Sequence, residues 1–308
     1  MTLSIVFVNW KSTAYLLDCI SSIYEYAPST EFEIIVVDNA SPDQDVDRVH
    51  QLFPAVRIIK SSKNLGFGGA NNLGAEHARG QFLLFLNPDT KLNSPALDRM
   101  LACLKAQPDA GIAGCRLLNG DLTLQTSCIQ TFPTILNQAL DAEVLRNRWP
   151  NWRMWGIAPL YRSESEPVPV EVISGACLMI KRSVFEAIGG FSPEYFMYAE
   201  DLDLCYKSHR AGYRNYYVGD ATVIHYGGGS SAARSATVMK WKSIVQYLVK
   251  NRGRSYALLF RMVMTLVAAL RIVLISTLYL LRVLRRSREF SESAKWKTIL
   301  QTLLCPSE

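Results

Sequence analysis

The chain has 308 residues, of which 49% are hydrophobic and 19% are charged, and this suits one large globular domain or one domain with an apolar appendage. Its net charge of +6 is unevenly distributed, because residues 234–288 hold twelve Lys or Arg and no Asp or Glu, while the rest of the chain carries 21 basic and 27 acidic residues. A weakly acidic globule with a basic, apolar C-terminal segment indicates an anionic membrane surface as partner and argues against a nucleic acid.

The first third of the chain alternates short β-branched runs with helical patterns. The expected strands are residues 3–8, 33–38, 56–60 and 81–86, and the expected helices are residues 12–26, 43–53 and 68–78. This alternation predicts an α/β fold with a mostly parallel sheet that is covered by helices on both faces. Residues 1–11 carry no basic leader and have the pattern of a first strand, so we expect a cytoplasmic protein.

The remaining part of the globule is less regular. A helix at 97–107 and a strand at 111–118 precede a Trp-rich stretch, 131–169, which we expect to be a substrate-facing insertion. The later patterns predict a strand at 170–181, helices at 183–188 and 199–211, and short strands at 215–218 and 222–226.

Three polar motifs follow expected strands, and ligands bind beyond the carboxyl ends of the strands in such sheets. They are Asn9-Trp10, Asp38-Asn39 and Asn87-Pro88-Asp89. Asp38 is either a turn residue or an acceptor for the N3–H group of uracil or thymine. Asp89 either caps a helix or binds a divalent cation, since Mg²⁺ uses one or two carboxylates together with substrate phosphates.

The stretch 64–72, NLGFGGANN, is rich in glycine. It fails the dinucleotide pattern G-x-G-x-x-G because Asn71 occupies the third glycine position after Gly66 and Gly68. Its glycines are explained either by a loop that needs positive φ angles or by a loop that presses against a ligand. We prefer the second interpretation, in which Asn64 and Asn71 offer hydrogen bonds.

Glu200 and Asp201 open an expected helix directly after the aromatic run 195–198. Acidic residues are favourable in any first helical turn. Adjacent helical side chains project about 100° apart, however, so the two carboxylates have different roles, and the aromatic flank could raise a carboxyl pKa into the range of a general base.

His225 closes an expected strand and precedes the glycines and serines of residues 227–231. A lone histidine is more often structural than a ligand. Successive backbone N–H groups in such a loop suit an anion, and a metal-bound diphosphate would explain the histidine and the loop together.

Together these motifs resemble the family 2 glycosyltransferases of the GT-A fold, most closely the bacterial rhamnosyltransferases that build polyprenyl-linked glycans in cell-wall and O-antigen assembly. The resemblance covers about residues 1–235. It rests on VNW at 8–10, VVDNAS at 36–41, NLGFGGANN at 64–72, FLNPDT at 85–90, SGACLMIKR at 174–182, GGFSPEYFMYAEDLDLC at 189–205 and VIHYGGGSS at 223–231.

The resemblance implies a role for each of these sites. Asp38 matches the pyrimidine-binding aspartate of the family. Asp89 matches the last acid of the D-x-D motif, which binds Mg²⁺ or Mn²⁺, and Asp201 matches the catalytic base. Asn87 replaces the first acid of that motif, so we expect weak metal binding without the donor. The donor-binding set comprises Asn9, Asp38, Asn39, Asn64, Gly66, Asn71 and Asp89; the metal site comprises Asp89 and His225; Glu200 accompanies the base; and Gly227, Gly228, Gly229, Ser230 and Ser231 form the diphosphate and acceptor loop.

The function implied by the resemblance is inverting, metal-dependent transfer of L-rhamnose from dTDP-L-rhamnose to a polyprenyl-diphosphate-linked saccharide. Two alternatives remain: a UDP-hexose donor with a similar lipid-linked acceptor, or an inactive membrane-bound scaffold, against which the intact Asp89, Asp201 and His225 argue. A homo-oligomer is an open alternative. We expect a catalytic domain at 1–233, with a nucleotide-binding half at 1–118 and an acceptor half at 119–233, followed by a membrane-association segment at 234–308.

Residues 262–281 are apolar apart from Arg271 and three hydroxyl residues. Eleven Leu, Ile or Val side chains contribute roughly −3 to −7 kcal/mol to bilayer insertion against roughly +3 for a central arginine, so insertion energy does not exclude a span. Basic clusters on both sides oppose one, because a span would place one cluster outside the cell. We therefore prefer amphipathic helices in the interface at the cytoplasmic face of the bacterial inner membrane over a span, core helices or a dimer contact.

Overall fold

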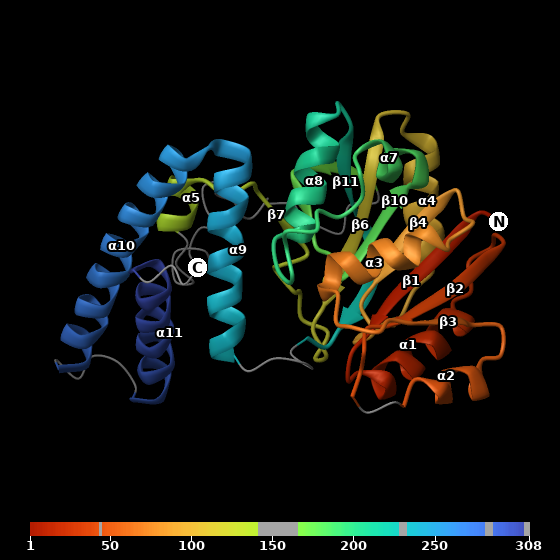
Figure 1. Cartoon of the computed structure of the whole chain (residues 1–308), viewed down its shortest axis with the longest axis horizontal. Helices are drawn as coiled ribbons and strands as arrows, with labels where there is room; N and C mark the ends of the chain where they lie inside the picture. The colour runs from red at the N-terminus through yellow and green to blue at the C-terminus, as the bar shows by residue number, and fades with distance from the viewer. Residues whose placement is uncertain (43–44, 141–165, 228–232, 281–285, 305–308) are drawn as a thin grey trace.

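A nine-stranded sheet organises the first two-thirds of the chain (Figure 1) in the computed structural model, which describes residues 1–42, 45–140, 166–227, 233–280 and 286–304. The strand order is β3-β2-β1-β4-β10-β6-β11-β5, with β8 paired to β11. The strands are β1 (Leu3–Asn9), β2 (Phe32–Asp38), β3 (Arg57–Lys60), β4 (Phe82–Leu86), β5 (Thr90–Leu92), β6 (Ala110–Leu118), β8 (Val168–Val170), β10 (Cys177–Lys181) and β11 (Arg214–His225). A second sheet pairs β7 (Ile129–Gln130) with β9 (Val172–Ile173).

The helices of this part cover both faces of the sheet. They are α1 (Thr13–Glu25), α2 (Asp47–Leu52), α3 (Gly66–Glu76), α4 (Ala96–Ala106), α7 (Arg182–Ala187) and α8 (Glu200–Arg210). The short helix α5 (Ile135–Ala139) instead packs against α10 (Arg254–Leu280) of the C-terminal segment (Figure 1). Val6 and Phe85 are paired neighbours whose side chains meet α3 and α7, whereas Cys177, paired with Leu86 on the opposite face, contacts Met100 of α4. The expected α/β fold with helices on both faces is confirmed.

The strands β1, β2, β3 and β4 are parallel, so their carboxyl ends lie at one edge of the sheet. This arrangement pairs Asn9 with Asp38 in the register, and each is the last residue of its strand. The strand β10 lies antiparallel between β4 and β6, and the sheet is therefore mostly, not wholly, parallel.

Three predicted elements differ in the structure. The expected strand at 170–181 is interrupted, because a turn at Ser174, Gly175 and Ala176 separates β9 from β10. The two short strands expected at 215–226 form one strand, β11, with an irregular register between Val218 and Thr222. The helix expected at 68–78 is confirmed as α3, but it begins at Gly66, so the glycine-rich stretch 64–72, also expected as a loop, contains its first two turns.

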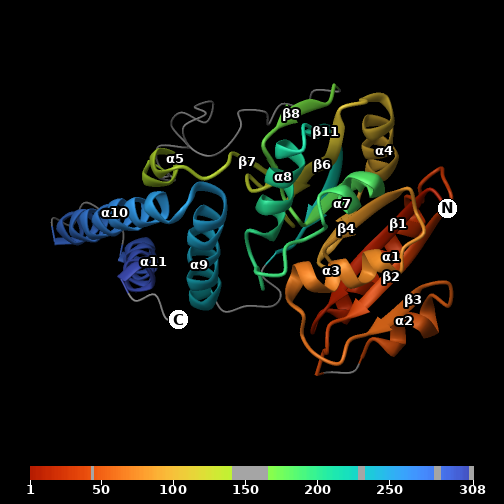
Figure 2. The ribbon, with the colours of Figure 1, turned by 45° about the horizontal axis from the view of Figure 1, so that its top comes forward.

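The basic C-terminal segment forms three long helices, α9 (Ala233–Arg252), α10 (Arg254–Leu280) and α11 (Arg286–Leu304), which pack against one another beside the sheet domain (Figures 1 and 2). The aromatic rings of Trp241 on α9 and Phe260 on α10 stack at 6.0 Å. The same α9 reaches the sheet domain, where Tyr247 meets Tyr206 of α8 edge-on at 5.7 Å. The helical unit is thus joined to α8 by direct packing.

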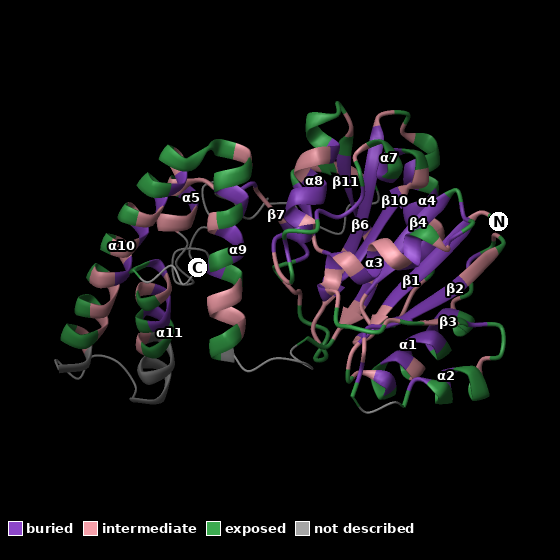
Figure 3. Cartoon of the chain, viewed as in Figure 1, coloured by how far each residue is buried: buried purple, intermediate pink, exposed green. Residues whose placement is uncertain are grey.

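One side of α10 remains exposed and apolar (Figure 3). Its outward side chains, each 50% or more exposed, are Leu258, Leu259, Met262, Leu266, Leu270, Val273 and Leu274. At 100° per residue they occupy an arc of about 160°, while the fully buried Phe260, Met264 and Ala268 face the other helices. Among the described helices, α10 alone is long and apolar enough to cross a membrane by length and composition.

Candidate active site

Asn9 and Asp38 form a buried pair at the carboxyl ends of β1 and β2. The Asn9 side chain donates a hydrogen bond from Nδ2 to Oδ1 of Asp38 at 3.2 Å, and Asp38 is 7% exposed. The orientation of Asn9 is fixed because its Oδ1 accepts hydrogen bonds from Ser12 and Thr13 at the start of α1. The structure therefore brings these two predicted donor residues together and holds the carboxylate in one direction.

Asn39, Asn64 and Gly66 form a second predicted group, and their polar atoms bond mainly to one another. Asn39 donates from Nδ2 to Oδ1 of Asn64 at 3.0 Å and accepts from the Leu65 N–H at 2.8 Å. Gly66 has a positive φ of 71°, and a Cβ atom there would lie 2.2 Å from the carbonyl oxygen of Phe196. Only glycine fits at this contact, which ties the start of α3 to the segment before α8.

Asn71, the last predicted donor-binding residue, lies within α3. Its side chain is 1% exposed and donates to the carbonyl oxygen of Phe67 at 3.1 Å. The structure thus gives Asn71 a hydrogen bond inside the helix.

Asp89 and His225 meet because β5 pairs with the end of β11, where His225 stands opposite Thr90. Oδ1 of Asp89 lies 3.3 Å from Nε2 of His225, and both side chains are 16% exposed. Among the described residues no cluster of three His, Cys, Asp or Glu side chains could hold a metal, so these two stand as a pair. Nearby, Oδ1 of Asn87 is buried and has no hydrogen-bond partner within the described chain.

Gln125 determines which nitrogen of His225 faces Asp89. Its Nε2 donates to two oxygens, Oδ1 of Asn119 and the backbone oxygen of His225, so its Oε1 is the atom that lies 2.7 Å from Nδ1 of His225. An amide oxygen only accepts hydrogen bonds, and Nδ1 must therefore carry the proton. In the neutral ring, Nε2 then presents a lone pair to the Asp89 carboxylate.

Two acceptor atoms facing each other are a poor contact unless a proton or a cation lies between them. Neighbouring ligands of an octahedral Mg²⁺, each at about 2.1 Å, lie roughly 3 Å apart, close to the separation found here. The pair Asp89 and His225, with the unpartnered Asn87 oxygen beside it, therefore fits a divalent cation.

A short backbone bridge connects this pair to the predicted base. The Asn87 N–H donates to the carbonyl oxygen of Ala176 at 2.9 Å, and the adjacent Gly175 N–H donates to Oδ2 of Asp201 at 2.8 Å. The turn between β9 and β10 thus holds the predicted metal-binding loop and the predicted base in a fixed relation.

Glu200 and Asp201 differ in environment, as expected for adjacent residues at the start of α8. Burial and, to a smaller extent, the Asp201 carboxylate raise the pKa of Glu200 to about 8, and its Oε2 has no hydrogen-bond partner in the described chain. Burial also raises the pKa of the half-buried Asp201 above its ordinary value, while the N–H groups of Gly175 and Leu202 stabilise its ionised form. The two N–H donors thus favour the ionised form of Asp201, whereas burial favours the neutral form of Glu200.

The backbone before these carboxylates is strained. Tyr198 and Ala199 have φ angles of 70° and 65°, in the left-handed region that non-glycine residues rarely adopt. Each such residue costs about 1–3 kcal/mol and persists only where the surroundings enforce it, most often at functional sites. The strain therefore marks the start of α8 as a position that the rest of the fold holds in place.

Of the predicted loop at 227–231, only Gly227 belongs to the described residues; Gly228, Gly229, Ser230 and Ser231 lie outside them.

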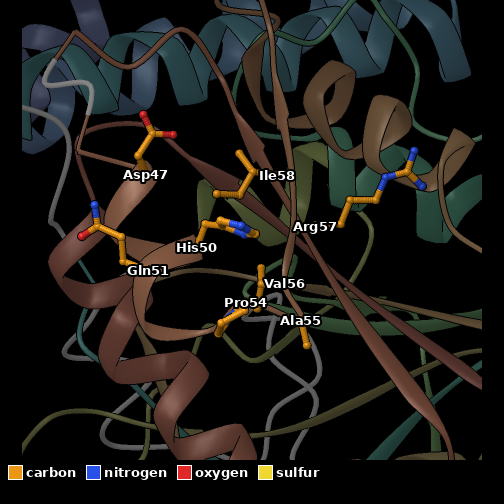
Figure 4. Close-up of a pocket in the computed structure, with 8 residues that line it drawn as sticks. All are labelled: Asp47, His50, Gln51, Pro54, Ala55, Val56, Arg57 and Ile58. Carbon is orange, nitrogen blue, oxygen red and sulfur yellow. The ribbon is translucent and has the colours of Figure 1, made fainter.

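A shallow hollow lies between α2 and the start of β3 (Figure 4), where His50, Gln51 and Arg57 are among its lining residues. It is at the amino end of β3, away from the strand ends that carry the predicted site.

Comparison with known proteins decides the family. Residues 4–189 match the sequence model of the family described as Glycosyl transferase family 2. The chain belongs to glycosyl transferase family 2. It is therefore a glycosyltransferase, and the resemblance drawn from the sequence motifs is confirmed.

This glycosyltransferase is similar to two bacterial proteins and to one solved structure. An N-acetylglucosaminyl-diphospho-decaprenol L-rhamnosyltransferase of Mycobacterium tuberculosis is 32% identical over 238 residues, which are 73% of this chain and 76% of that protein. Rhamnosyltransferase WbbL of Escherichia coli is 25% identical over 235 residues, 73% of this chain and 85% of its own. The structure of mannosyltransferase PcManGT from Pyrobaculum calidifontis, in complex with GDP-Man and Mn²⁺, matches with a TM-score of 0.64 at 17% identity. The match covers 99% of this chain and 88% of that protein, and at this identity it shows only that the two share the GT-A fold.

The sequence motifs did not identify every residue of this site. Gln125 lies in an irregular stretch, one hundred residues before the histidine that it orients, and no spacing or composition distinguishes it. Gly175 lies within a run that the sequence pattern predicts as one continuous strand. Both act through contacts that only the folded chain creates.

Proposed function

We propose that this glycosyltransferase transfers L-rhamnose from dTDP-L-rhamnose to a polyprenyl-diphosphate-linked saccharide, with inversion at the anomeric carbon. The observation that carries the proposal is the backbone bridge from Asn87 through Gly175 to Asp201, because it connects the proposed base to the pair of side chains that fits a divalent cation. Two relatives named as rhamnosyltransferases support the sugar, and the name of one of them supports a lipid-diphosphate acceptor.

Each residue of the site has a part in this reaction. Asp38, oriented by Asn9, accepts the N3–H of the pyrimidine, and Asp89 and His225 are the residues that would hold Mg²⁺ or Mn²⁺. A cation bound there would supply positive charge to stabilise the departing nucleotide diphosphate. Asp201 removes the proton from the acceptor hydroxyl, whose oxygen attacks the face of the sugar opposite the leaving group. A single base without a covalent intermediate gives inversion.

We also propose that the enzyme lies on the cytoplasmic face of the bacterial membrane through the exposed stripe of α10. Arg271, whose charge would oppose contact with lipid, points into the helical unit: it donates to the carbonyl oxygen of Ala139 at 2.8 Å and lies 4.2 Å from the ring centre of Trp296. The outward face is thus apolar while the unit remains basic, as in interfacial helices. Packing of α9 on α8 keeps α10 alongside the catalytic domain and favours this arrangement over a span.

A donor screen tests the proposal. The purified enzyme with Mg²⁺ and a synthetic polyprenyl-diphosphate-linked N-acetylglucosamine is offered dTDP-L-rhamnose, UDP-glucose or UDP-galactose, and products are analysed by mass spectrometry and NMR. We expect a rhamnosyl product whose anomeric configuration is opposite to that of the donor. Efficient transfer from a UDP-hexose would replace the donor assignment, and absence of transfer from every donor would favour the inactive scaffold.

The metal is tested separately. Asp89→Ala and His225→Ala should each abolish the metal-dependent part of dTDP-L-rhamnose binding, measured by calorimetry with and without Mg²⁺. Full turnover in excess chelator would exclude the metal from the mechanism.

A further inference from the structure

The carboxylate of Asp203, one turn into α8, is fully buried and receives four hydrogen bonds. Within the catalytic domain, Ser192 donates to its Oδ2 at 2.6 Å and Tyr195 donates to its Oδ1 at 3.4 Å. The other two donors come from α9: Nζ of Lys250 reaches Oδ2, and Nδ2 of Asn251 reaches Oδ1, each at 3.1 Å. Half of the bonds that satisfy this carboxylate are therefore supplied by the C-terminal helical unit.

The same helix holds the segment that leads into the base. Ser243 donates to the carbonyl oxygen of Met197 at 3.0 Å, and Gln246 donates to the carbonyl oxygen of Glu194 at 3.1 Å. Lys250 also lies 3.3 Å from the Glu194 carboxylate and donates to Ser192 at 2.8 Å. The bonded residues span the whole approach to the strained pair Tyr198 and Ala199.

The opposite side of this approach is held by α3. The N–H of Phe67 donates to the carbonyl oxygen of Phe196 at 2.9 Å. The two left-handed residues thus follow a segment that is bonded to α3 on one side and to α9 on the other, and Glu200 and Asp201 come directly after them.

We propose that α9 is a positioning element for the catalytic base, in which Lys250 and Asn251 hold α8 through Asp203 and Ser243 holds the strained approach. The inference rests on the proposed role of Asp201. It gives α9 a part in positioning the base, in addition to the membrane attachment proposed for α10. A buried carboxylate that loses its cationic partner is strongly destabilised where it stands, so the loss of Lys250 shifts α8 and the base with it.

The main test replaces Lys250 by methionine, which keeps most of the unbranched side chain and removes the charged amino group. Turnover of dTDP-L-rhamnose with the synthetic acceptor, and calorimetric affinity for dTDP, are measured on the full chain well below the melting temperature. We expect kcat of Lys250→Met to fall at least tenfold while dTDP affinity changes less than twofold. Lys250→Arg, which restores a cation, should recover much of the lost kcat.

A stability control separates positioning from general damage. Ile299→Ala removes a buried contact inside the helical unit, distant from Asp203, and should lower the melting temperature while kcat remains near wild type. If Lys250→Met cannot be purified folded, Ser243→Ala removes only the hydroxyl that holds Met197 and should lower kcat several-fold.

The outcomes are distinct. The inference is overturned if Lys250→Met keeps the wild-type kcat. Where that variant does not fold, a wild-type kcat in Ser243→Ala overturns it. A fall of kcat in Ile299→Ala equal to that in Lys250→Met also overturns it. Asp201→Asn is assayed in parallel: if it retains turnover, the base assignment fails, whereas an inactive Asp201→Asn beside a fully active Lys250→Met refutes the positioning role alone.

Discussion

Oε1 of Gln125 lies 2.7 Å from Nδ1 of His225, and this hydrogen bond turns the other ring nitrogen toward Asp89. Such an outer hydrogen bond fixes the tautomer and the ring plane of a metal-binding histidine. The finding makes Gln125 a positioning residue of the proposed cation site, because it acts through His225.

The first prediction follows from this relationship. Gln125→Leu should weaken Mn²⁺ binding in the presence of dTDP about 10–100-fold, because the imidazole loses its orientation. Electron paramagnetic resonance of free Mn²⁺ measures the change. The matched control is Gln130→Leu on β7. The Gln130 side chain donates a hydrogen bond to the backbone oxygen of Ser127. Equal Mn²⁺ affinity in both variants would contradict the role of Gln125.

The second prediction concerns the base. Asp201→Asn should lower turnover about 10²–10⁴-fold and leave donor affinity intact, because the amide cannot accept a proton but can still accept the Gly175 hydrogen bond. Turnover and calorimetric donor affinity are measured side by side. If the variant kept more than about a tenth of the wild-type rate, another group would have to be the base.

The third prediction uses the raised pKa of Glu200. The folded state binds this proton with a pKa of about 8, against the ordinary value of 4.5, so the stability given by the neutral carboxyl is complete below about pH 4.5 and is lost as the pH rises through 8. Glu200→Gln stays neutral, and between pH 6 and pH 9 its melting temperature should therefore fall less than that of wild type. Glu76→Gln, at an exposed site, serves as control, and a wild-type pH response in Glu200→Gln would argue against a buried neutral carboxyl.

The fourth prediction concerns the exposed stripe of α10. The double variant Leu266→Glu, Leu270→Glu should float with anionic liposomes at least about tenfold less, since each buried leucine contributes about 1.5–3 kcal/mol. Leu52 and Leu122, each 61% exposed and outside the helical unit, provide a control double variant of the same charge. Undiminished flotation of the stripe variant would remove α10 from membrane binding, and attachment that resists alkaline carbonate would favour a span.

The sheet was predictable because its strands are almost continuously apolar, and the residues that follow β1, β2 and β4 were predictable because parallel strands collect their polar ends at one edge. The helix pattern at 68–78 indicates most of α3, but the glycines at its start also suggest a loop. Glycine is needed in this helix for close packing: a Cβ atom on Gly74 would lie 2.3 Å from a methyl carbon of Val6. Tertiary packing here outweighs the low helix propensity of glycine.

The candidate site shows the same division. Asp38, Asp89, Asp201 and His225 lie in local motifs that a sequence displays directly. The partners that orient His225 and hold the helix of Asp201 do not lie in such motifs. Gln125 reaches His225 across one hundred residues, and Lys250 reaches Asp203 on α8 across 47. Lysine at an exposed turn of a basic helix gives no local signal of an ion pair with a buried carboxylate.

The place of β10 in the sheet has a consequence for synthesis of the chain. Strands β1 to β4 pair with one another as they emerge, but the sheet partners of β6 are β10 and β11, both made later. At about 5–20 residues per second, the roughly 60 residues between β6 and β10 take roughly 3–12 s. During that interval the apolar run of β6 has two open edges, which invite pairing with other chains. The newly made protein is therefore most prone to aggregate after β1 to β4 have paired and before β10 arrives.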